Sequence, residues 1–380
     1  MTLISIVGDD ISRIVPLLFA YREKIRHHVL LCDDDPSNYQ RAKKLQHGMQ
    51  RFSDKYKLGW HTKIISANED SASSIKEAAQ RAFAHSTQLW LNATDGYPGI
   101  TILLSDLVRQ EGGKILSYDH FDNDLHTIEP DGTMHTQKLA SKIDMESYLT
   151  LLDYRIVHQV EKSEIEGRKK AVLSLFKEES RFVKLRQALV AKALQKPYDF
   201  DFSTATEMLE TLKQIGIVDN NFDLIPSKQS MLQGGLYEEY IFWLCESLNP
   251  DDIRMAVTID FDDKSAEPLS NHRVQNEFDI VLMYNNRLHT VECKYSKSLN
   301  GLEIVYKYDA IIDYFGKASK AIIANISSKP KKKYMQTKTS SNFRPSTLRR
   351  GRMAGISVYH ETQMNPIKFQ NLVRNFFHLG

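Results

Sequence analysis

The sequence predicts two α/β domains joined by a mainly helical segment. In residues 1–140, short apolar runs alternate with helical patterns, which is typical of a parallel sheet covered by helices. Residues 141–230 carry long amphipathic stretches, and residues 231–380 combine a helix with paired strands. The length of 380 residues suits two or three domains.

The composition is that of an ordinary globular protein. Hydrophobic residues make up 42% of the chain and charged residues 26%, and the formal net charge is +2. Any preference for nucleic acid therefore has to come from local clusters of charge. Cys32, Cys245 and Cys293 suit neither a disulfide framework nor a zinc module, and no apolar stretch is long enough to cross a bilayer. We expect a cytoplasmic protein that does not enter a membrane.

The N-terminal region is expected to form five parallel strands and a closing hairpin. The strands are predicted at residues 3–7, 28–31, 61–66, 88–92 and 114–118, and the hairpin turns at Asp131-Gly132. Ligands of such sheets bind at the carboxyl ends of the strands. We therefore predict ligand contacts in the first loop (residues 8–12) and the second loop (residues 92–99). No G-x-G-x-x-G pattern begins at Gly8, which argues against a dinucleotide cofactor.

The middle region is predicted to be helical, with amphipathic stretches at residues 145–160 and 166–194. Residues 204–215, followed by a tight hairpin at residues 216–224, have the outline of a winged helix. Two interpretations stay open for this region. It is either a connector between two working domains, which we favour, or an element that recognises DNA.

The C-terminal region contains a predicted hairpin that carries charged residues. Asn285-Asn286 tolerates the positive φ angles of a two-residue turn. Counting from that turn places Asp279 opposite Glu292, with Lys294 on the same face. Opposed residues have Cβ atoms about 5 Å apart, and like charges there are destabilising unless compensated. The pattern predicts a site for a hard divalent cation, Mg²⁺ or Mn²⁺.

These residues also supply the groups that phosphodiester hydrolysis needs. A bound metal lowers the pKa of a water and neutralises charge on the phosphate. A lysine beside it orients the water or stabilises the transition state. A surface ion-pair ladder is the alternative. Apolar neighbours such as Phe278 and Val291 leave neither face of the strands wholly polar, which favours the metal site.

The hairpin resembles the restriction-endonuclease-like PD-(D/E)xK nucleases, with Asp279 as the metal-binding aspartate and Glu292-Cys293-Lys294 as the ExK element. Residues 276–294 and 233–240 are similar to CRISPR-associated effector nucleases. In that family a CARF sensor domain is joined to such a nuclease, which cyclic oligoadenylate activates. The similarity spans most of the chain and is strongest from residue 234 to residue 294.

This resemblance implies three domains and a function in type III CRISPR antiviral defence. Residues 1–140 would be a Rossmann-like CARF domain, residues 141–230 a helical or winged-helix connector, and residues 231–380 a nuclease domain that cleaves DNA, RNA or both. Glu238 would join Asp279 and Glu292 at the metal, with Glu239 as a possible substitute.

The resemblance also implies a homodimer that binds cyclic oligoadenylate, with cyclic tetra-adenylate as the expected ring. The implied ligand-binding residues are Gly8, Asp9 and Asp10 in the first loop and Asn92, Thr94, Asp95 and Gly96 in the second. Loop amides and a helix N-terminus suit phosphate binding.

The second loop departs from the family pattern Asn-x-Thr-Gly-Gly-x-Lys. Asp95 stands at the first of those glycines and Pro98 at the lysine, and both changes work against an anionic ring. Three consequences stay open: a different size or pose of activator, compensation by another basic residue such as Arg13, or a weakened sensor. Alternatively, the loop is simply a strand-to-helix turn, with Pro98 at the start of a helix.

A basic segment without acidic residues lies between residues 329 and 360. It suits contacts to a nucleic-acid backbone, and a solvated basic loop is the alternative. The predicted contact residues are Lys331, Lys332, Lys333, Arg349 and Arg350.

Two other functions remain open at this point. One is a ligand-independent restriction- or repair-type endonuclease that recognises duplex DNA through its winged helix. The other is a non-catalytic CARF sensor or regulator.

Overall fold

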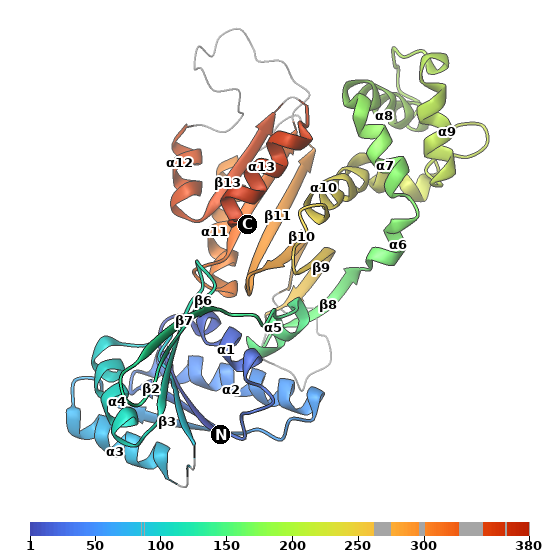
Figure 1. Cartoon of the computed structure of the whole chain (residues 1–380). Helices are drawn as coiled ribbons and strands as arrows, with labels where there is room; N and C mark the ends of the chain where they lie inside the picture. Colours follow the sequence, from blue (N-terminus) through green and yellow to red (C-terminus); the bar gives the residue numbers. More distant parts are fainter. Residues whose placement is uncertain are drawn as a thin grey trace.

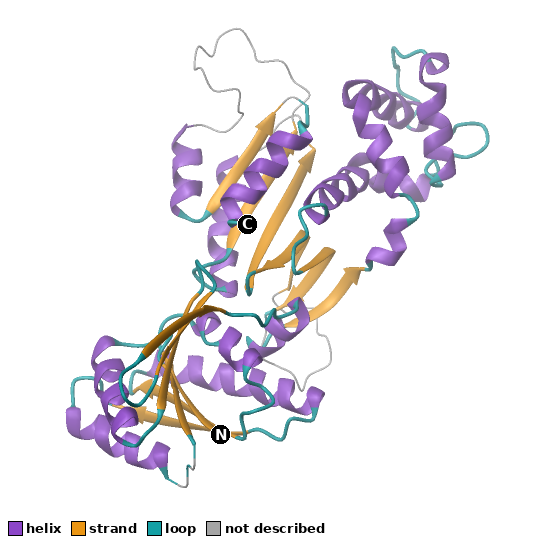
Figure 2. Cartoon of the chain, viewed as in Figure 1, coloured by secondary structure: helices purple, strands orange, loops and turns teal. Residues whose placement is uncertain are grey.

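The computed structural model describes residues 1–84, 86, 88–261, 275–295, 301–326, 345–361 and 363–379. These residues form two mixed sheets with covering helices and a separate group of helices (Figure 1). The N-terminal sheet lies at the bottom of the view, the second sheet above it, and the helices α6 to α9 at the upper right (Figure 2). The predicted α/β fold class is confirmed.

The N-terminal sheet has the strand order β3-β2-β1-β4-β5-β6-β7. Neighbours from β3 to β5 are parallel, and β6 and β7 continue the sheet antiparallel. The chain runs outward from β1 to β3 and then returns to β4 on the other side of β1. The loops after β1 and β4 therefore leave adjacent strand ends, the place where parallel sheets bind ligands. The strands are β1 (Thr2–Val7), β2 (His27–Asp33), β3 (His61–Ala67), β4 (Leu89–Asn92), β5 (Lys114–Asp119), β6 (Asp124–Ile128) and β7 (Met134–Lys138).

Helices cover both faces of this sheet, which is why its central strands are apolar throughout. On one face, α3 (Ala72–Phe83) and α4 (Pro98–Gln110) bury their apolar side chains against Ile4 and Ile6. On the other, α1 (Val15–Ala20) and α2 (Pro36–Tyr56) pack against Leu3 and Val7. Pro98 is the first residue of α4, as in the alternative interpretation of the second loop as a strand-to-helix turn.

The second sheet has the order β13-β12-β11-β10-β9-β8. Strands β8 to β11 are antiparallel, and β11, β12 and β13 are parallel. Helices α10 and α13 cover one face and α11 the other, while α12 packs beside β13. The elements are β8 (Arg155–Val160), α10 (Leu236–Glu246), β9 (Asp252–Asp260), β10 (Gln275–Tyr284), β11 (Arg287–Tyr295), α11 (Gly301–Ile312), β12 (Lys320–Ile326), α12 (Pro345–Met353), β13 (Ile356–Glu361) and α13 (Pro366–Phe377).

The prediction of a helix over residues 145–160 is wrong in its second half. Helix α5 (Met145–Leu151) ends at Leu151, and β8 follows as an edge strand of the second sheet, paired with β9. Local amphipathic spacing cannot reveal this, because the pairing partner lies about a hundred residues away in the chain.

The predicted helix over residues 166–194 is interrupted. Helices α6 (Lys162–Glu166), α7 (Lys169–Leu175) and α8 (Glu179–Ala193) are separate, with a 3₁₀ turn between α7 and α8. Phe176 in that turn stacks on Tyr240 of α10 at 4.3 Å between ring centroids, so the break serves packing. Helix α9 (Thr206–Gln214) and an isolated bridge between Val218 and Leu224 occupy the region of the predicted winged helix, which stays a prediction.

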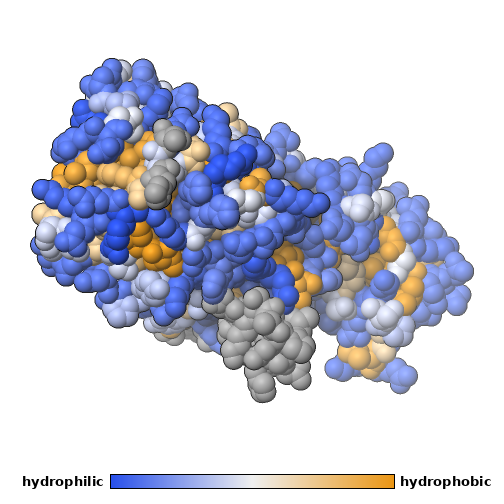
Figure 3. Space-filling model, turned by 90° about the horizontal axis from the view of Figure 1, so that it is seen from below, coloured by the Kyte–Doolittle hydropathy of each residue, from blue (hydrophilic) through white to orange (hydrophobic). Residues whose placement is uncertain are grey.

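One buried apolar cluster crosses from the N-terminal sheet into the second sheet. It includes Leu3 and Val7 of β1 together with Val257, Phe278 and Phe315 of the second sheet and its helices. The face shown in Figure 3 is mainly hydrophilic, with hydrophobic residues in small separate areas. Within the described residues, no helix is long and apolar enough to span a membrane.

The predicted turn at Asn285-Asn286 is confirmed, with φ angles of 48° and 59°. It rests on the N-terminal sheet. The Tyr118 hydroxyl of β5 lies 3.2 Å from the Asn285 carbonyl oxygen, and the Asn286 amide donates to Asn123 Oδ1 at 3.1 Å. The Asn286 Oδ1 atom in turn accepts from the backbone N–H of Ile143 at 2.9 Å. The end of the β10–β11 hairpin is thus held by Tyr118 of β5, by Asn123 of the β5–β6 turn and by the Ile143 backbone.

Replacing Tyr118 with Phe tests this anchor. The variant loses a hydroxyl that serves both Asn285 and Asn123, which is expected to cost about 1 kcal/mol and to lower Tm by about 2 °C. The measurement is thermal unfolding followed by circular dichroism. Tyr39→Phe, at an exposed tyrosine of α2, is the control and should not change Tm. Equal Tm values for both variants would contradict the anchor.

His28 is a fully buried histidine in β2. Its Nε2 atom lies 2.9 Å from Ser5 Oγ and its Nδ1 atom 3.2 Å from Met49 Sδ, and burial lowers its pKa to about 3. The folded protein therefore keeps this ring neutral, while the unfolded chain takes up a proton near its ordinary pKa. Since the unfolded state binds more protons in this range, the free energy of unfolding falls as the pH drops below about 6.5.

The expected loss from His28 is up to about 1.4 kcal/mol per pH unit below that value. Unfolding of the wild type and of His28→Gln would be measured at neutral and at mildly acidic pH. We expect His28→Gln to be less stable at neutral pH but to lose less stability on acidification. His135→Gln, at an exposed position of β7, should keep the wild-type pH dependence. The same dependence in all three proteins would refute the assignment.

Candidate functional site

Strands β10 and β11 bring Asp279, Glu292 and Lys294 together. Lys294 Nζ lies 2.5 Å from Glu292 Oε1 and 3.9 Å from Asp279 Oδ2. The two carboxylate side chains are 6% and 16% exposed, whereas Lys294 is 33% exposed. The structure therefore groups the three residues as the hairpin register predicts.

The register is confirmed from the Tyr284–Arg287 pair as far as the Ile280–Val291 pair. The pairing of β10 with β11 ends there, one pair before Asp279 and Glu292. On the other edge of β10, the pairing with β9 includes Phe278 and Ile280 but skips Asp279. Asp279 Oδ2 instead accepts from the backbone N–H of Cys293 at 2.6 Å. Ala256 of β9, at the position that would pair with Asp279, has a φ of 50°. Such strained backbone costs about 1–3 kcal/mol and is concentrated at functional sites.

Among the described residues, the site holds more acidic than basic side chains, because Glu238, Asp279 and Glu292 face the single ammonium of Lys294. Burial raises the pKa of Asp279, and the Glu292 carboxylate raises it further against the opposing effect of Lys294. Burial lowers the pKa of Lys294, but the Glu292 and Asp279 carboxylates have the larger combined effect and raise that pKa above its ordinary value. Burial likewise raises the pKa of Glu238, and the nearby Glu277 and Glu292 carboxylates raise it further. A further cation would stabilise this group of carboxylates.

Helix α10 carries both predicted acidic candidates, and the structure separates them. Glu239 is fully buried and is held by Arg168 of the connector, whose Nε donates to both carboxylate oxygens at 2.8 Å. Glu238 is half-buried on the side of the helix that interacts electrostatically with Lys294 and Asp279. Glu239 as a substitute for Glu238 is therefore wrong, because its carboxylate already has a structural partner.

Tyr308 of α11 belongs to the site and was not predicted from the sequence as a site residue. Its buried hydroxyl donates to Glu292 Oε2, while Lys294 contacts the other oxygen of that carboxylate. Tyr308 lies on the apolar side of a helix, where a tyrosine usually indicates core packing.

The donor set fits a hard divalent cation in its chemistry. Asp279, Glu292 and Glu238 offer oxygen ligands, and their mutual repulsion is the kind that Mg²⁺ or Mn²⁺ relieves. In the described part of the chain, no three such side chains already converge as a metal-binding group, and Lys294 is the cation between Asp279 and Glu292. Binding of a metal stays a prediction.

The two predicted ligand loops meet at the carboxyl ends of β1 and β4. Asp95 Oδ2 accepts from the backbone N–H groups of Gly8 at 2.9 Å and Asp10 at 3.2 Å. Asn92 Oδ1 accepts from the Thr94 N–H at 3.1 Å. All four side chains, Asp10, Asn92, Thr94 and Asp95, are buried. Asp9 is instead exposed and lies 3.3 Å from Arg41 of α2.

Each loop is also connected to the second sheet. In the first loop, Asp10 Oδ2 accepts from the backbone N–H of Lys317, which follows the end of α11, at 2.9 Å. Gly316 beside it has a φ of 99°, and an added Cβ would lie 1.8 Å from Ser12 Oγ. In the second loop, Thr94 Oγ1 accepts from the Tyr118 N–H at 3.0 Å, and Tyr118 reaches the Asn285 carbonyl. The first loop thus contacts the segment that follows α11, and the second loop reaches the hairpin through Tyr118 of β5.

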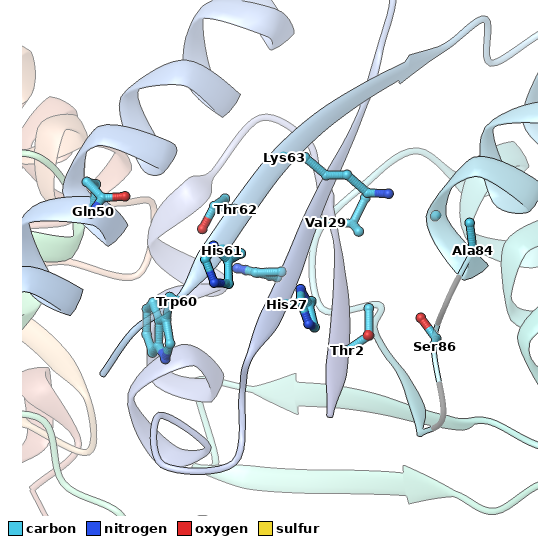
Figure 4. A pocket seen from close by; sticks show the side chains of 12 residues that line it. Thr2, His27, Val29, Gln50, Trp60, His61, Thr62, Lys63, Ala84 and Ser86 are labelled. Carbon is cyan, nitrogen blue, oxygen red and sulfur yellow. The ribbon is translucent and has the colours of Figure 1, made fainter. Parts of the chain in front are cut away.

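A cavity of about 410 Å³ lies at the amino ends of the strands of the N-terminal sheet, opposite the two predicted ligand loops (Figure 4). Thr2, His27 and His61, at the starts of β1, β2 and β3, line it together with Trp60 and Lys63. It contains none of the predicted site residues. Because ligands of parallel sheets bind at the carboxyl ends of the strands, we assign this cavity no part in the site.

The predicted nucleic-acid contacts fall into two groups. Lys331, Lys332 and Lys333 lie outside the described residues. Arg349 and Arg350 are exposed on α12. Arg350 lies 3.7 Å from Asp309 and 4.1 Å from the ring centroid of Tyr306, so its charge is partly engaged by α11.

Residues 226–338 match the family model described as "Card1-like, endonuclease domain". This range contains Glu238, Asp279, Glu292 and Lys294, and the predicted resemblance to an effector nuclease is confirmed for it. The sequence matches no curated protein.

Solved structures share the fold along the whole chain. Can2 from Sulfobacillus thermosulfidooxidans, solved with cyclic tetra-adenylate, matches with a TM-score of 0.68 at 16% identity over 99% of both chains. Protein VC1899 from Vibrio cholerae matches with a TM-score of 0.70 at 17% identity, over 99% of this chain and 97% of the other. A type III CRISPR defence DNA nuclease activated by cyclic oligoadenylate has a TM-score of 0.50 at 15% identity. It is matched over 87% of this chain and 47% of its own length.

The separation of Glu238 from Glu239 predicts different effects on stability. Arg168→Ala leaves the buried Glu239 carboxylate without its partner and should lower the free energy of unfolding by about 3 kcal/mol. Glu238→Gln should change it by less than about 1 kcal/mol. The measurement is unfolding in urea, with Arg181→Ala, at an exposed connector arginine, as the control. A stable Arg168→Ala protein would overturn the structural role of the Arg168–Glu239 pair.

Proposed function

We propose that this chain is a metal-dependent nuclease of type III CRISPR antiviral defence that cyclic oligoadenylate activates. The observation that carries the proposal is the grouping of Asp279, Glu292 and Lys294 on one hairpin, inside the range that matches a Card1-like endonuclease domain. The fold shared with Can2, which was solved with cyclic tetra-adenylate, supports the sensor part.

The charged site would perform hydrolysis through residues with separate roles. Asp279, Glu292 and Glu238 would hold Mg²⁺ or Mn²⁺, which supplies a water of lowered pKa and neutralises charge on the phosphate. Tyr308 and the Cys293 N–H orient the carboxylates of Glu292 and Asp279. Lys294 lies beside both carboxylates and is the most exposed of the three hairpin residues, which supports a role in which its ammonium would contact a phosphate oxygen or the attacking water.

Activation would begin at the first and second loops. Two chains would form a homodimer and bind the cyclic oligoadenylate between their N-terminal sheets. The ligand would shift an existing equilibrium between two arrangements of the chain. The Asp10–Lys317 and Tyr118–Asn285 contacts offer physical links by which the loops bias the position of α11 and of the hairpin.

A cleavage assay tests the proposal. The protein is incubated with Mn²⁺ and with plasmid, single-stranded DNA or RNA, with and without cyclic tetra- or hexa-adenylate. We expect cleavage that needs both metal and ring and that chelation of the metal abolishes. Lys294→Ala should lower the rate by about 10²–10³-fold, because it removes a charge beside the reacting phosphate. Lys76→Ala, at an exposed lysine of α3, should cleave like the wild type.

The possible outcomes separate the competing functions. Cleavage that ignores every ring would retain the nuclease and remove its activation, as for a restriction- or repair-type enzyme. The absence of metal-dependent cleavage under all conditions would reject the nuclease and leave a non-catalytic sensor.

A further inference from the structure

The second loop supplies an anion to the amides of the first loop. Asp95 Oδ2 accepts both the Gly8 N–H at 2.9 Å and the Asp10 N–H at 3.2 Å, and its side chain is only 7% exposed. The two loops also approach closely, because a Cβ added to Gly8 would lie 2.8 Å from the Gly96 nitrogen. Asp95 therefore fills the space in front of these two amides.

These amides have the properties of an anion-binding site. They converge on a single oxygen atom at the carboxyl end of β1, beside the point where the strand order reverses. Backbone N–H groups in this position bind phosphate oxygens in other parallel sheets. A carboxylate oxygen has the same hydrogen-bonding role and the same sign of charge as a phosphate oxygen. A phosphate group therefore cannot reach both amides while Asp95 remains on them.

The charge of Asp95 is only partly compensated. Burial raises its pKa, the two backbone hydrogen bonds oppose that effect, and the neighbouring Asp10 carboxylate raises it further. Arg13 Nη1, the nearest cationic group, lies 3.9 Å from Asp95 Oδ1, beyond hydrogen-bonding distance. Asp95 is thus held mainly by two amides that an incoming anion would also use.

Other polar atoms near the loops lack a partner among the described residues. Arg13 Nε and Asn92 Nδ2 are both buried donors without a hydrogen bond there. Buried donors of this kind usually have a partner, and each that lacks one calls for an explanation. A polar ligand at this edge of the sheet would supply acceptors for them.

We propose that Asp95 sets the affinity of the sensor for its ligand, because its carboxylate occupies the Gly8 and Asp10 amides as an internal competitor of a ligand phosphate group. The inference rests on the proposed function, since it takes cyclic oligoadenylate as the ligand of these loops. It explains how an acidic residue can stand at the centre of a site for an anionic ring.

The same competition ties ligand binding to the second sheet. Asp10 gives its N–H to Asp95 and receives the Lys317 N–H on its own carboxylate. A phosphate that displaces Asp95 therefore changes the hydrogen bonding of Asp10, which holds the segment that follows α11 through the Lys317 N–H. Helix α11 carries Tyr308, which contacts Glu292.

The test replaces Asp95 with Asn in the full chain and measures binding of cyclic tetra-adenylate by calorimetry. Asn keeps the shape and one accepting oxygen but removes the negative charge. We expect Kd to fall by about tenfold or more, since a like charge within a few ångströms of the phosphate is removed. Asp95→Glu keeps the charge and should not bind more tightly. Asp106→Asn, at an exposed position of α4, is the matched control and should leave Kd unchanged.

If the wild type binds the ring and Asp95→Asn binds it equally or more weakly, the inference is overturned while the proposed function stands. If neither protein binds cyclic tetra- or hexa-adenylate, both the inference and the ligand part of the function fail. The ligand-free cleavage assay then decides the nuclease part separately. Circular dichroism checks folding, and Asp95→Ser, also neutral and able to accept a hydrogen bond, replaces Asp95→Asn if that variant does not fold.

Discussion

The constraint on which the rest of the site depends is the two-residue turn between β10 and β11. With both asparagines in the left-handed region, the turn fixes which residues of the two strands face each other, and so brings Asp279, Glu292 and Lys294 to one place. The turn itself is held by Tyr118 and Asn123 of the N-terminal sheet. The position of the charged group therefore depends on the local geometry of the turn and on the N-terminal sheet that holds the turn.

The two sheets behave as one packed body rather than as tethered domains. A continuous apolar cluster joins β1 to β9, β10 and α11, and hydrogen bonds from Asp10 of the first loop and Tyr118 of β5 cross the same boundary. Closely packed interiors do not deform smoothly, so a small rearrangement at one face tends to move whole elements between discrete positions. The Asp10–Lys317 and Tyr118–Asn285 contacts are the places where such a movement would enter the second sheet.

At both candidate sites, a charged side chain of the protein contacts groups that could otherwise bind an external ion. Lys294 stands between Asp279 and Glu292, and Asp95 occupies two backbone amides. In the proposed function, Lys294 stands where a metal ion would bind and Asp95 stands where a phosphate of the ligand would bind. The Arg168–Glu239 pair differs, because its carboxylate is fully buried and bidentate contact satisfies both oxygens. That pair belongs to the framework of the fold.

The sequence by itself determined the parallel strands, the Asn285-Asn286 turn and the grouping of the hairpin residues, because strand alternation and turn chemistry depend on neighbours along the chain. Only the tertiary structure decided the rest. Residues 155–160 became a strand through pairing with β9, Tyr308 reached Glu292 from another element, and Arg168 engaged Glu239 rather than Glu238. The Asp95 carboxylate likewise meets the Gly8 amide across 87 residues of chain. Such contacts join elements that local periodicity does not relate, so they follow only from how the packed sheets and helices meet.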